Sequence, residues 1–275
     1  MFSKVVRVID LLLIEYNFFI AFCSVSILLF FSILMQYHYP FSVYGFTFTS
    51  TLGTYNLFRA YPSFKVYLSD FKSFIFFLVS ISFALSGIFY LFLPLDVQVY
   101  YGIVGILTML YKFNVFGFSS LRSIPYLKLP MIAIIWVLTG SIYLLLHFSQ
   151  FNELHQMNDV HRISGLLIMQ FFFFIAITIP FDVFGMIEDD MKTVPRRLGV
   201  KKSLFISKTL LVLYVVTSLF IYKRIEFILA SFLLAAITFL LVHWSPKFQK
   251  KSLQYYLIDG TIILQTILFY FFLRL

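Results

Sequence analysis

Four carboxylate side chains lie close together in the segment from residue 179 to residue 199. They are Asp182, Glu188, Asp189 and Asp190, four of the 12 acidic residues in the chain. If one helix runs through the segment, Asp182 and Asp189 share a face and lie roughly 10 Å apart along the axis. One bare ion is too small to bridge them, but a diphosphate with bound Mg²⁺ could, since Mg²⁺ completes its shell with water and phosphate oxygens. The spacing therefore indicates a site for magnesium and a diphosphate.

A structural interpretation of the same segment stays open. Residues 188–190 could form a solvated acidic turn, with Thr193 as the N-cap of a short helix that Gly199 closes. Asp182 fits this interpretation less well, because it follows a long apolar run at an expected membrane boundary. An ionisable group at that depth is a functional candidate.

Basic side chains could hold the phosphates of such a ligand. Arg196 and Arg197 follow the acidic segment directly, and a guanidinium can bind two phosphate oxygens at once. Neighbouring loops that are expected on the same side of the membrane supply further cations. These loops could equally be solvated connectors, and Arg59 could be an interfacial anchor. The candidates in these segments are Arg59, Lys65, Arg122, Lys128, Arg196 and Arg197.

The composition requires that membrane-spanning helices position these residues. The 275 residues are 61% hydrophobic and 12% charged, whereas a soluble domain has about 25% charged residues. The formal net charge of +9 does not indicate nucleic-acid binding, because most of the positive charge lies in short gaps between apolar runs. We expect an all-α polytopic bundle in a lipid bilayer, formed by a single domain over residues 1–275. The expected location is the cytoplasmic membrane of a bacterium.

Nine apolar stretches approach the roughly 20 residues that a membrane-spanning helix needs. The second stretch is the weakest, because Ser, Thr, Tyr and Asn are scattered through it. The predicted spans are Leu12–Met35, Phe41–Phe58, Ser73–Leu93, Val97–Tyr111, Pro130–Phe148, Ile163–Phe181, Phe205–Tyr222, Phe227–His243 and Tyr255–Phe272.

The distribution of positive charge predicts the orientation. If the N-terminus is cytoplasmic and the nine spans alternate, 17 of the 21 basic residues fall on the cytoplasmic side, as the positive-inside rule requires. The remaining four are Arg162, Lys223, Arg224 and Arg274. Nine helices therefore predict a cytoplasmic N-terminus and a C-terminus on the outside.

The chain resembles the UbiA superfamily of intramembrane prenyltransferases in its motifs. That family has nine helices, a cytoplasmic N-terminus and two aspartate-rich motifs, which follow helices two and six. Thr193–Gly199 matches the Thr-x-Pro-x-x-Leu-Gly tail of the second motif, and Asp182 and Asp189 match its first and last carboxylates. The Leu121–Lys128 loop and the Asp259-Gly260 pair also look like those of a divergent branch.

The chain departs from the family at both motifs. The family's Asn-Asp-x-x-Asp stretch corresponds to Asn56–Ala60 here, so the Asn is kept and both aspartates are missing. Gly185 replaces the middle aspartate of the second motif. The resemblance implies that Asn56 lies at the diphosphate, and Arg59 could compensate phosphate charge in place of a metal ligand.

The resemblance implies transfer of a prenyl chain from a prenyl diphosphate to an acceptor that is membrane-soluble or aromatic. Mg²⁺ would assist the departure of the diphosphate, with Asp182, Asp189, Glu188 and Asp190 as candidate ligands. A relative with altered catalysis that binds isoprenoid lipid or supports a partner is an alternative, because expected carboxylates are lost. A transporter is a third hypothesis.

Two further side chains carry structural expectations. Trp136 fits an interfacial aromatic belt. Asp259, about one turn into the ninth predicted helix, is expected to pair with a loop cation or to cap a neighbouring helix.

Overall fold

The computed structural model describes residues 7–114, 119–124, 126–146, 156–187, 193–221, 224–248 and 250–274. All regular secondary structure within these ranges is helical. The main helices are α2 (Phe18–Met35), α3 (Phe41–Ala60), α5 (Phe74–Leu91), α6 (Leu95–Lys112), α7 (Lys128–Gly140), α9 (Gln156–Phe184), α11 (Val200–Ile221), α12 (Ile225–Trp244) and α14 (Gly260–Arg274).

Shorter helical segments connect or extend the main helices. Two are π-helices, η1 (Leu11–Glu15) before α2 and η6 (Tyr255–Asp259) before α14. The others are α4 (Phe64–Ser69), η2 (Leu121–Ser123), α8 (Ile142–Leu146), η4 (Gly185–Ile187), α10 (Val194–Leu198), η5 (Ser245–Lys247) and α13 (Lys251–Gln254).

Six helical segments of the described chain are long and apolar enough to cross a membrane. They are Phe18–Met35, Phe74–Leu91, His161–Phe184, Val200–Ile221, Ile225–Lys247 and Ser252–Arg274. The protein is therefore an all-helical polytopic membrane protein. Helix α5 shows the lipid-facing pattern most clearly, since Val79, Ser82 and Ser86 are its buried residues and its remaining surface is almost wholly apolar.

Each of the nine predicted spans lies on one of the main helices, although several bounds differ. The fifth span is broken, because α7 ends at Gly140 and the chain resumes a helix as α8 after Ser141. The sixth helix begins at Gln156, well before the predicted Ile163. The first span is interrupted at Asn17, whose left-handed φ of 59° separates η1 from α2.

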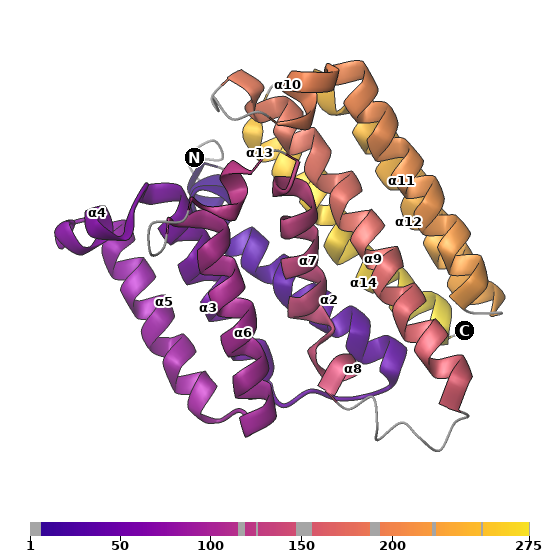
Figure 1. Ribbon diagram of the computed structural model, residues 1–275, viewed down its shortest axis with the longest axis horizontal. Coiled ribbons are helices and arrows are strands. Elements are labelled where there is room, and N and C mark those ends of the chain that lie inside the picture. The colour runs from indigo at the N-terminus through magenta and orange to yellow at the C-terminus, as the bar shows by residue number, and fades with distance from the viewer. Residues whose placement is uncertain are drawn as a thin grey trace.

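The helices form two packed groups (Figure 1). On one side, α9 packs against α11, α11 against α12, and α12 against α14; on the other, α3 packs against α5. Helices α2 and α7 lie between the groups, since α2 contacts both α14 and α3 and α7 contacts both α9 and α6.

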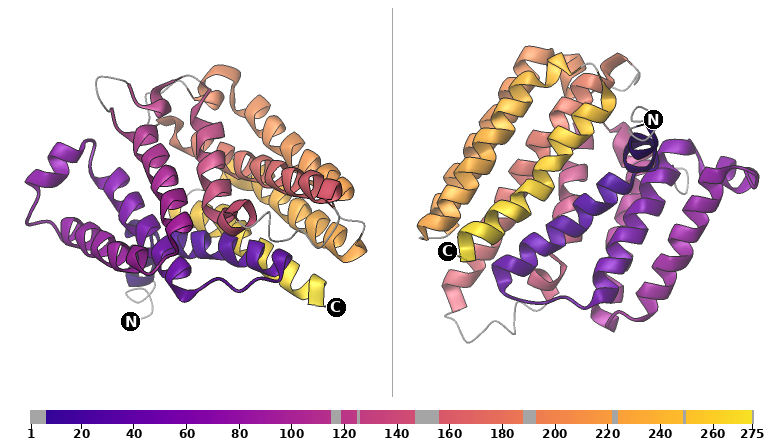
Figure 2. Two further views of the ribbon diagram at one scale, coloured as in Figure 1. Left: turned by 60° about the horizontal axis from the view of Figure 1, so that its bottom comes forward. Right: turned by 180° about the vertical axis from the view of Figure 1, so that it is seen from behind.

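The segments α4, α10 and α13 lie at one end of the bundle, and α8 and the C-terminal end of α14 lie at the other (Figures 1 and 2). We name the first of these the basic end, because Arg59, Lys112 and Lys128 terminate helices there.

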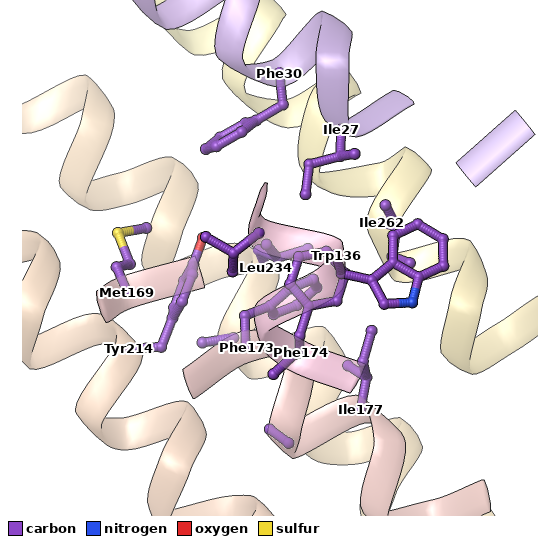
Figure 3. Close-up of a cluster of buried hydrophobic side chains, with 14 of the residues drawn as sticks. Ile27, Phe30, Trp136, Met169, Phe173, Phe174, Ile177, Tyr214, Leu234 and Ile262 are labelled. Carbon is purple, nitrogen blue, oxygen red and sulfur yellow. The ribbon is translucent and has the colours of Figure 1, made fainter. Parts of the chain in front are cut away.

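A hydrophobic core joins α2, α7, α9, α11, α12 and α14. Phe173 and Tyr214 are fully buried in it, and Trp136 lies at its edge (Figure 3). The Trp136 ring stacks on Phe174, with ring centroids 5.4 Å apart and an interplanar angle of 17°. The expectation that Trp136 belongs to an interfacial belt is therefore wrong, because its ring is 8% exposed and packs between helices.

Candidate functional site

A cavity opens between α3, α6 and α7 toward the basic end. Its outer chamber has a volume of about 270 Å³, near the lower limit of ~300 Å³ for ordinary ligand pockets. An inner chamber of about 120 Å³ adjoins it. The two chambers share five wall residues, Thr54, Tyr55, Thr108, Ile135 and Trp136, so we treat them as one cavity.

Most of the cavity wall comes from α3, α6 and α7, the main helices that do not reach the length and hydropathy of the six apolar spans. Ser24 of α2 and Tyr255 of η6 also line it. Helices α3 and α6 are long but polar, and α7 is apolar but short. Their hydroxyl-bearing residues Ser50, Thr51, Thr54, Thr108 and Thr139 line the chambers. The polarity that makes α3 and α6 poor membrane spans by composition is thus directed into the cavity, where it does not contact lipid.

Three cations lie in the wall of the outer chamber. Arg59 comes from the last turn of α3, Lys112 ends α6, and Arg122 lies in η2. The wall contains no carboxylate among the described residues. Since a group of positive charges in a partly enclosed site attracts anions, the outer chamber is suited to an anionic ligand.

Arg59 is held in place by the π-helix η1. Its Nη1 donates to the carbonyl oxygens of Ile14 at 2.8 Å and Glu15 at 3.0 Å, and its Nη2 forms an ion pair with the Glu15 carboxylate. These carbonyls belong to the last residues of η1, where backbone acceptors have no helical partner. Arg59 therefore fixes η1 against α3 while its side chain also lines the outer chamber.

Asn56 supports the same wall through buried hydrogen bonds. Its Nδ2 donates to the carbonyl oxygens of Tyr16 and Leu52, both at 2.9 Å, and its Oδ1 accepts from Asn17 Nδ2 at 3.1 Å. Asn56 is 2% exposed and is not part of the chamber wall, whereas Asn17 is. The structure therefore places Asn56 behind the cavity, where it orients Asn17 and the start of α2.

Five aromatic side chains also line the outer chamber. Tyr55, Phe58, Tyr111, Trp136 and Tyr255 line it from four different segments. Tyr255 begins the π-helix η6, and π-helical turns occur frequently at functional sites. A ligand with its anionic group at the three cations would thus also contact aromatic side chains of the same chamber.

Asp182 and Lys128 form a buried ion pair that joins α9 to α7. Lys128 Nζ donates to Asp182 Oδ1 at 2.6 Å, and the two side chains are 18% and 4% exposed. The partner of Asp182 in the structure is thus the first residue of α7. Neither residue belongs to the cavity wall.

The other predicted cations lie away from the outer chamber. Arg196 donates to the carbonyl oxygen of Met186 at 2.9 Å. Arg197 donates to the Tyr126 hydroxyl at 2.7 Å, and its guanidinium lies 4.6 Å from that ring. Lys65 is exposed on the short helix α4. The structure therefore brings Arg59 and Arg122 to the cavity but places Lys65, Lys128, Arg196 and Arg197 elsewhere.

The turn that precedes α4 is fixed by a tyrosine. Tyr61 directly follows α3 and donates through its hydroxyl to Asp70 Oδ2 at 3.0 Å. Burial raises the pKa of the Tyr61 phenol, and the hydrogen bond to the Asp70 carboxylate raises it further. This contact holds α4 against the base of α3, so Lys65 stays on the outer surface.

The described residues that line the cavity do not form a magnesium site. Glu188, Asp189 and Asp190 lie outside the described residues. Within the described chain, no group of three His, Cys, Asp or Glu residues comes together. Asp182 binds an ammonium group, and cations line the chamber itself. The donor set around the chamber therefore suits a phosphate better than a metal ion, and we derive no step through magnesium.

Asp259 is an intramembrane carboxylate beside the cavity. It is 7% exposed, and no hydrogen bond or ion pair reaches its carboxylate from the described part of the chain. Its carbonyl accepts from Cys23 Sγ at 3.5 Å, and its carboxylate interacts electrostatically with Tyr55. It ends η6, four residues after the cavity-wall residue Tyr255, and is not itself part of the wall. The expected pairing with a loop cation is thus not seen in the described chain.

Comparison of the chain with protein-family models, with curated proteins and with solved structures returns no match. The function is therefore inferred below from the sequence motifs and from the geometry of the cavity.

The sequence motifs did not single out several of these residues. Lys112 ends its helix at the same end of the bundle as Arg59. This shared position is the feature of the sequence that could have identified Lys112 as a residue of the cavity wall. Tyr55 directly precedes Asn56, but which of the two faces the cavity depends on the rotation of α3. Trp136 and Tyr255 gave no signal, because aromatic residues are frequent throughout this chain.

Proposed function

We propose that this protein is a UbiA-like membrane prenyltransferase, which moves a prenyl chain from a prenyl diphosphate to a membrane-soluble or aromatic acceptor. The observation that carries the proposal is the division of the outer chamber's wall between three cations and five aromatic side chains. A prenyl diphosphate has the matching division into an anionic head and an apolar tail. The sequence motifs at Thr193–Gly199 support the same class.

The cations of the mouth would bind the diphosphate and stabilise it as it leaves. When the bond between the prenyl carbon and the phosphate oxygen breaks, the electron pair stays on the diphosphate. Arg59, Lys112 and Arg122 carry fixed positive charge at that position, and preorganised charge of this kind stabilises a departing anion. Arg59 is the most rigid of the three, since η1 holds its guanidinium.

The aromatic wall would face the prenyl carbon as positive charge develops on it. The faces of Tyr55 and Trp136 carry partial negative charge, and such faces attract a cation within about 6 Å. The apolar chain would continue along the inner chamber, where Phe46, Val104 and Met109 contribute apolar surface.

Asp259 is the group best placed to take the proton that the acceptor loses. In the transfer step, the acceptor atom forms a bond to the prenyl carbon, the bond to the diphosphate breaks, and the proton of the acceptor passes to a base. Asp259 is buried beside Tyr55 and one turn beyond Tyr255, so an acceptor in the aromatic part of the cavity would lie near it.

A second function, binding of isoprenoid diphosphates or lipids without transfer, is favoured by one observation. Asp182 is the motif carboxylate within the described residues, and it forms an ion pair with Lys128. A relative that had lost metal-assisted chemistry would keep the cavity and its cations. The two functions differ in whether a prenylated product forms.

The proposal includes an arrangement in the membrane. We propose nine spans, a cytoplasmic N-terminus and an outer C-terminus, in the cytoplasmic membrane of a bacterium. The basic end and the mouth of the cavity then face the cytoplasm, where water-soluble diphosphates are available.

Equilibrium binding of farnesyl diphosphate to the purified full-length protein tests the proposal. We expect Arg122→Gln and Lys112→Gln each to weaken binding by about tenfold or more, because each removes a charged hydrogen-bond donor worth roughly 1.5–3 kcal/mol. Lys65→Gln is the matched control, since Lys65 is exposed on α4. If all three variants bind farnesyl diphosphate with the affinity of the wild type, the cavity is not the binding site.

Formation of a prenylated product separates the two candidate functions. Mass spectrometry of the membrane extract after incubation with farnesyl diphosphate and a panel of phenols and lipid alcohols should detect a prenylated acceptor. Binding with no product from any acceptor would favour the relative without transfer.

A further inference from the structure

An apolar groove lies on the outer face of the bundle, between α11 and α12. These helices are adjacent at one edge of the molecule (Figures 1 and 2). A groove of about 450 Å³ runs between them, and every residue that lines it is apolar. It is separate from the cavity, with which it shares no wall residue.

The groove has a floor of small side chains and walls of large ones. Ala235 and Ala236 come from α12 and lie at the bottom of the groove, where Ala235 is buried. Val212 and Val216 of α11 and Phe232 of α12 stand at the edges and are exposed. In a membrane these edges contact acyl chains, so the groove has the shape of a channel for one extended apolar chain.

Positive charge stands at the basic end of the groove. Lys208 Nζ lies 5.1 Å from the centre of the Phe239 ring, which lines the groove, and 3.0 Å from His243 Nδ1. The ammonium is thus directed along the groove edge from α11 to α12. A lysine side chain is long enough to carry its charge toward the headgroups, so the basic end of the groove is a cationic site.

Both helices show the same change from apolar to basic along the face that forms the groove. On α11 the face runs through Val216, Val212, Lys208 and Lys201. On α12 it runs through Phe232, Phe239 and His243, and Lys247 follows in η5. Helix α11 contains no acidic residue, and the single acidic residue of α12, Glu226, lies at its opposite end.

We propose that this groove binds an anionic phospholipid, with one acyl chain along Ala235 and Ala236 and the phosphate at Lys208 and His243. Basic sites between membrane helices bind anionic headgroups, and the apolar channel supplies a position for the chain. The proposal does not depend on the function of the cavity.

A second copy of this chain fits the groove less well. Two copies that pack through this face in the same membrane orientation use the same patch on each. Lys208 and His243 of both copies would then meet at one depth, and like charges at such a contact repel. A phosphate at the same position compensates the charge.

Native mass spectrometry of the full-length protein in mixed micelles tests this site. The micelles contain phosphatidylglycerol and phosphatidylcholine with identical acyl chains. We expect the wild type to retain phosphatidylglycerol in preference to phosphatidylcholine. Lys208→Gln combined with His243→Gln should reduce that preference by about tenfold, and Ala236→Phe, which fills the groove, should reduce retention of both lipids. Lys65→Gln, an exposed cation on α4, should leave the preference unchanged.

Three results would overturn the proposal. They are equal retention of the two lipids by the wild type, an unchanged preference in the Lys208→Gln/His243→Gln variant, and a dimer that Ala236→Phe dissociates without effect on lipid. The thermal unfolding temperature of the Lys208→Gln/His243→Gln variant in lipid-free detergent should equal that of the wild type, which shows that the variant is folded.

Discussion

Side chains at the basic end have two roles: some hold helices together and some line the cavity. Their contacts show which role each side chain has. Arg59 and Asn56 each bind backbone carbonyls, so both hold helices together, and of the two Arg59 alone lines the outer chamber. Arg122, a candidate from the Leu121–Lys128 loop, also lines that chamber, and so does Lys112, which the sequence did not single out. The cations that bind a ligand are thus identified by the wall they share, since their spacing along the sequence does not identify them.

The ion pair between Lys128 and Asp182 allows a prediction on stability. Asp182→Asn should lower the free energy of unfolding by about 3 kcal/mol, because removal of one partner leaves a mostly buried charge uncompensated. The double variant Asp182→Leu/Lys128→Met should recover most of the loss, since an apolar pair of similar volume replaces a buried ion pair at little cost. Thermal unfolding in a fixed detergent measures both. Unchanged stability of Asp182→Asn would refute the structural role.

Helices α2 and α7 approach closely because of a glycine. A Cβ at Gly140 would lie 2.7 Å from Ile27 Cγ1 and 3.0 Å from the Phe31 ring, and both of those side chains are fully buried. Small residues allow this kind of approach between membrane helices. The contact brings α7, which carries Trp136 and Ile135, against the helices that complete the cavity.

Gly140→Ala should therefore destabilise the protein by about 1–3 kcal/mol, the usual cost of overpacking. Gly87→Ala on α5 is the matched control, because a Cβ there meets nothing within 4 Å. The control should be neutral or slightly stabilising, since Gly in a helix costs roughly 0.5–1 kcal/mol relative to Ala. If the two variants unfold at the same temperature, close packing at Gly140 does not matter.

Much of the helical arrangement could be predicted from the sequence, and the site largely could not. Apolar runs mark lipid-facing helices, so α5, α11 and α12 are found within a few residues. Hydropathy predicts α3, α6 and α7 less well. Helices α3 and α6 carry polar residues that line an internal cavity, and α7 is short. The ion pairs Arg59–Glu15 and Lys128–Asp182 join residues 44 and 54 positions apart, and such pairings depend on helix rotation, which no local pattern specifies.

At the scale of the whole molecule, the basic end and the opposite end differ in charge and in connections. The segments α4, α10 and α13 lie at the basic end, while the short connections between α2 and α3 and between α5 and α6 lie at the other (Figure 1). One end therefore holds the mouth of the cavity and the cationic end of the lipid groove. The positive-inside rule predicts that this end faces the cytoplasm.

Labelling with a thiol reagent that does not cross membranes tests this orientation. The background is Cys23→Ser, which removes the chain's single cysteine. In right-side-out vesicles, Leu95→Cys should be labelled, because Leu95 is 75% exposed at the end opposite the basic end. Lys65→Cys on α4 should be labelled after the vesicles are opened. The reverse pattern would place the basic end outside, and labelling of both sites in intact vesicles would contradict a membrane-spanning arrangement.

The most direct test of the account is ligand-dependent thermal stability of the wild-type protein with the chelator EDTA present. Farnesyl diphosphate should stabilise the folded protein, by about 2.7 kcal/mol at a hundredfold excess over Kd. The stabilisation should persist in EDTA, because the side chains of Arg59, Lys112 and Arg122 supply the positive charge. Farnesol, which lacks the diphosphate, should stabilise the protein much less. Loss of stabilisation in EDTA, or equal stabilisation by farnesol, would contradict recognition of the diphosphate by these side chains.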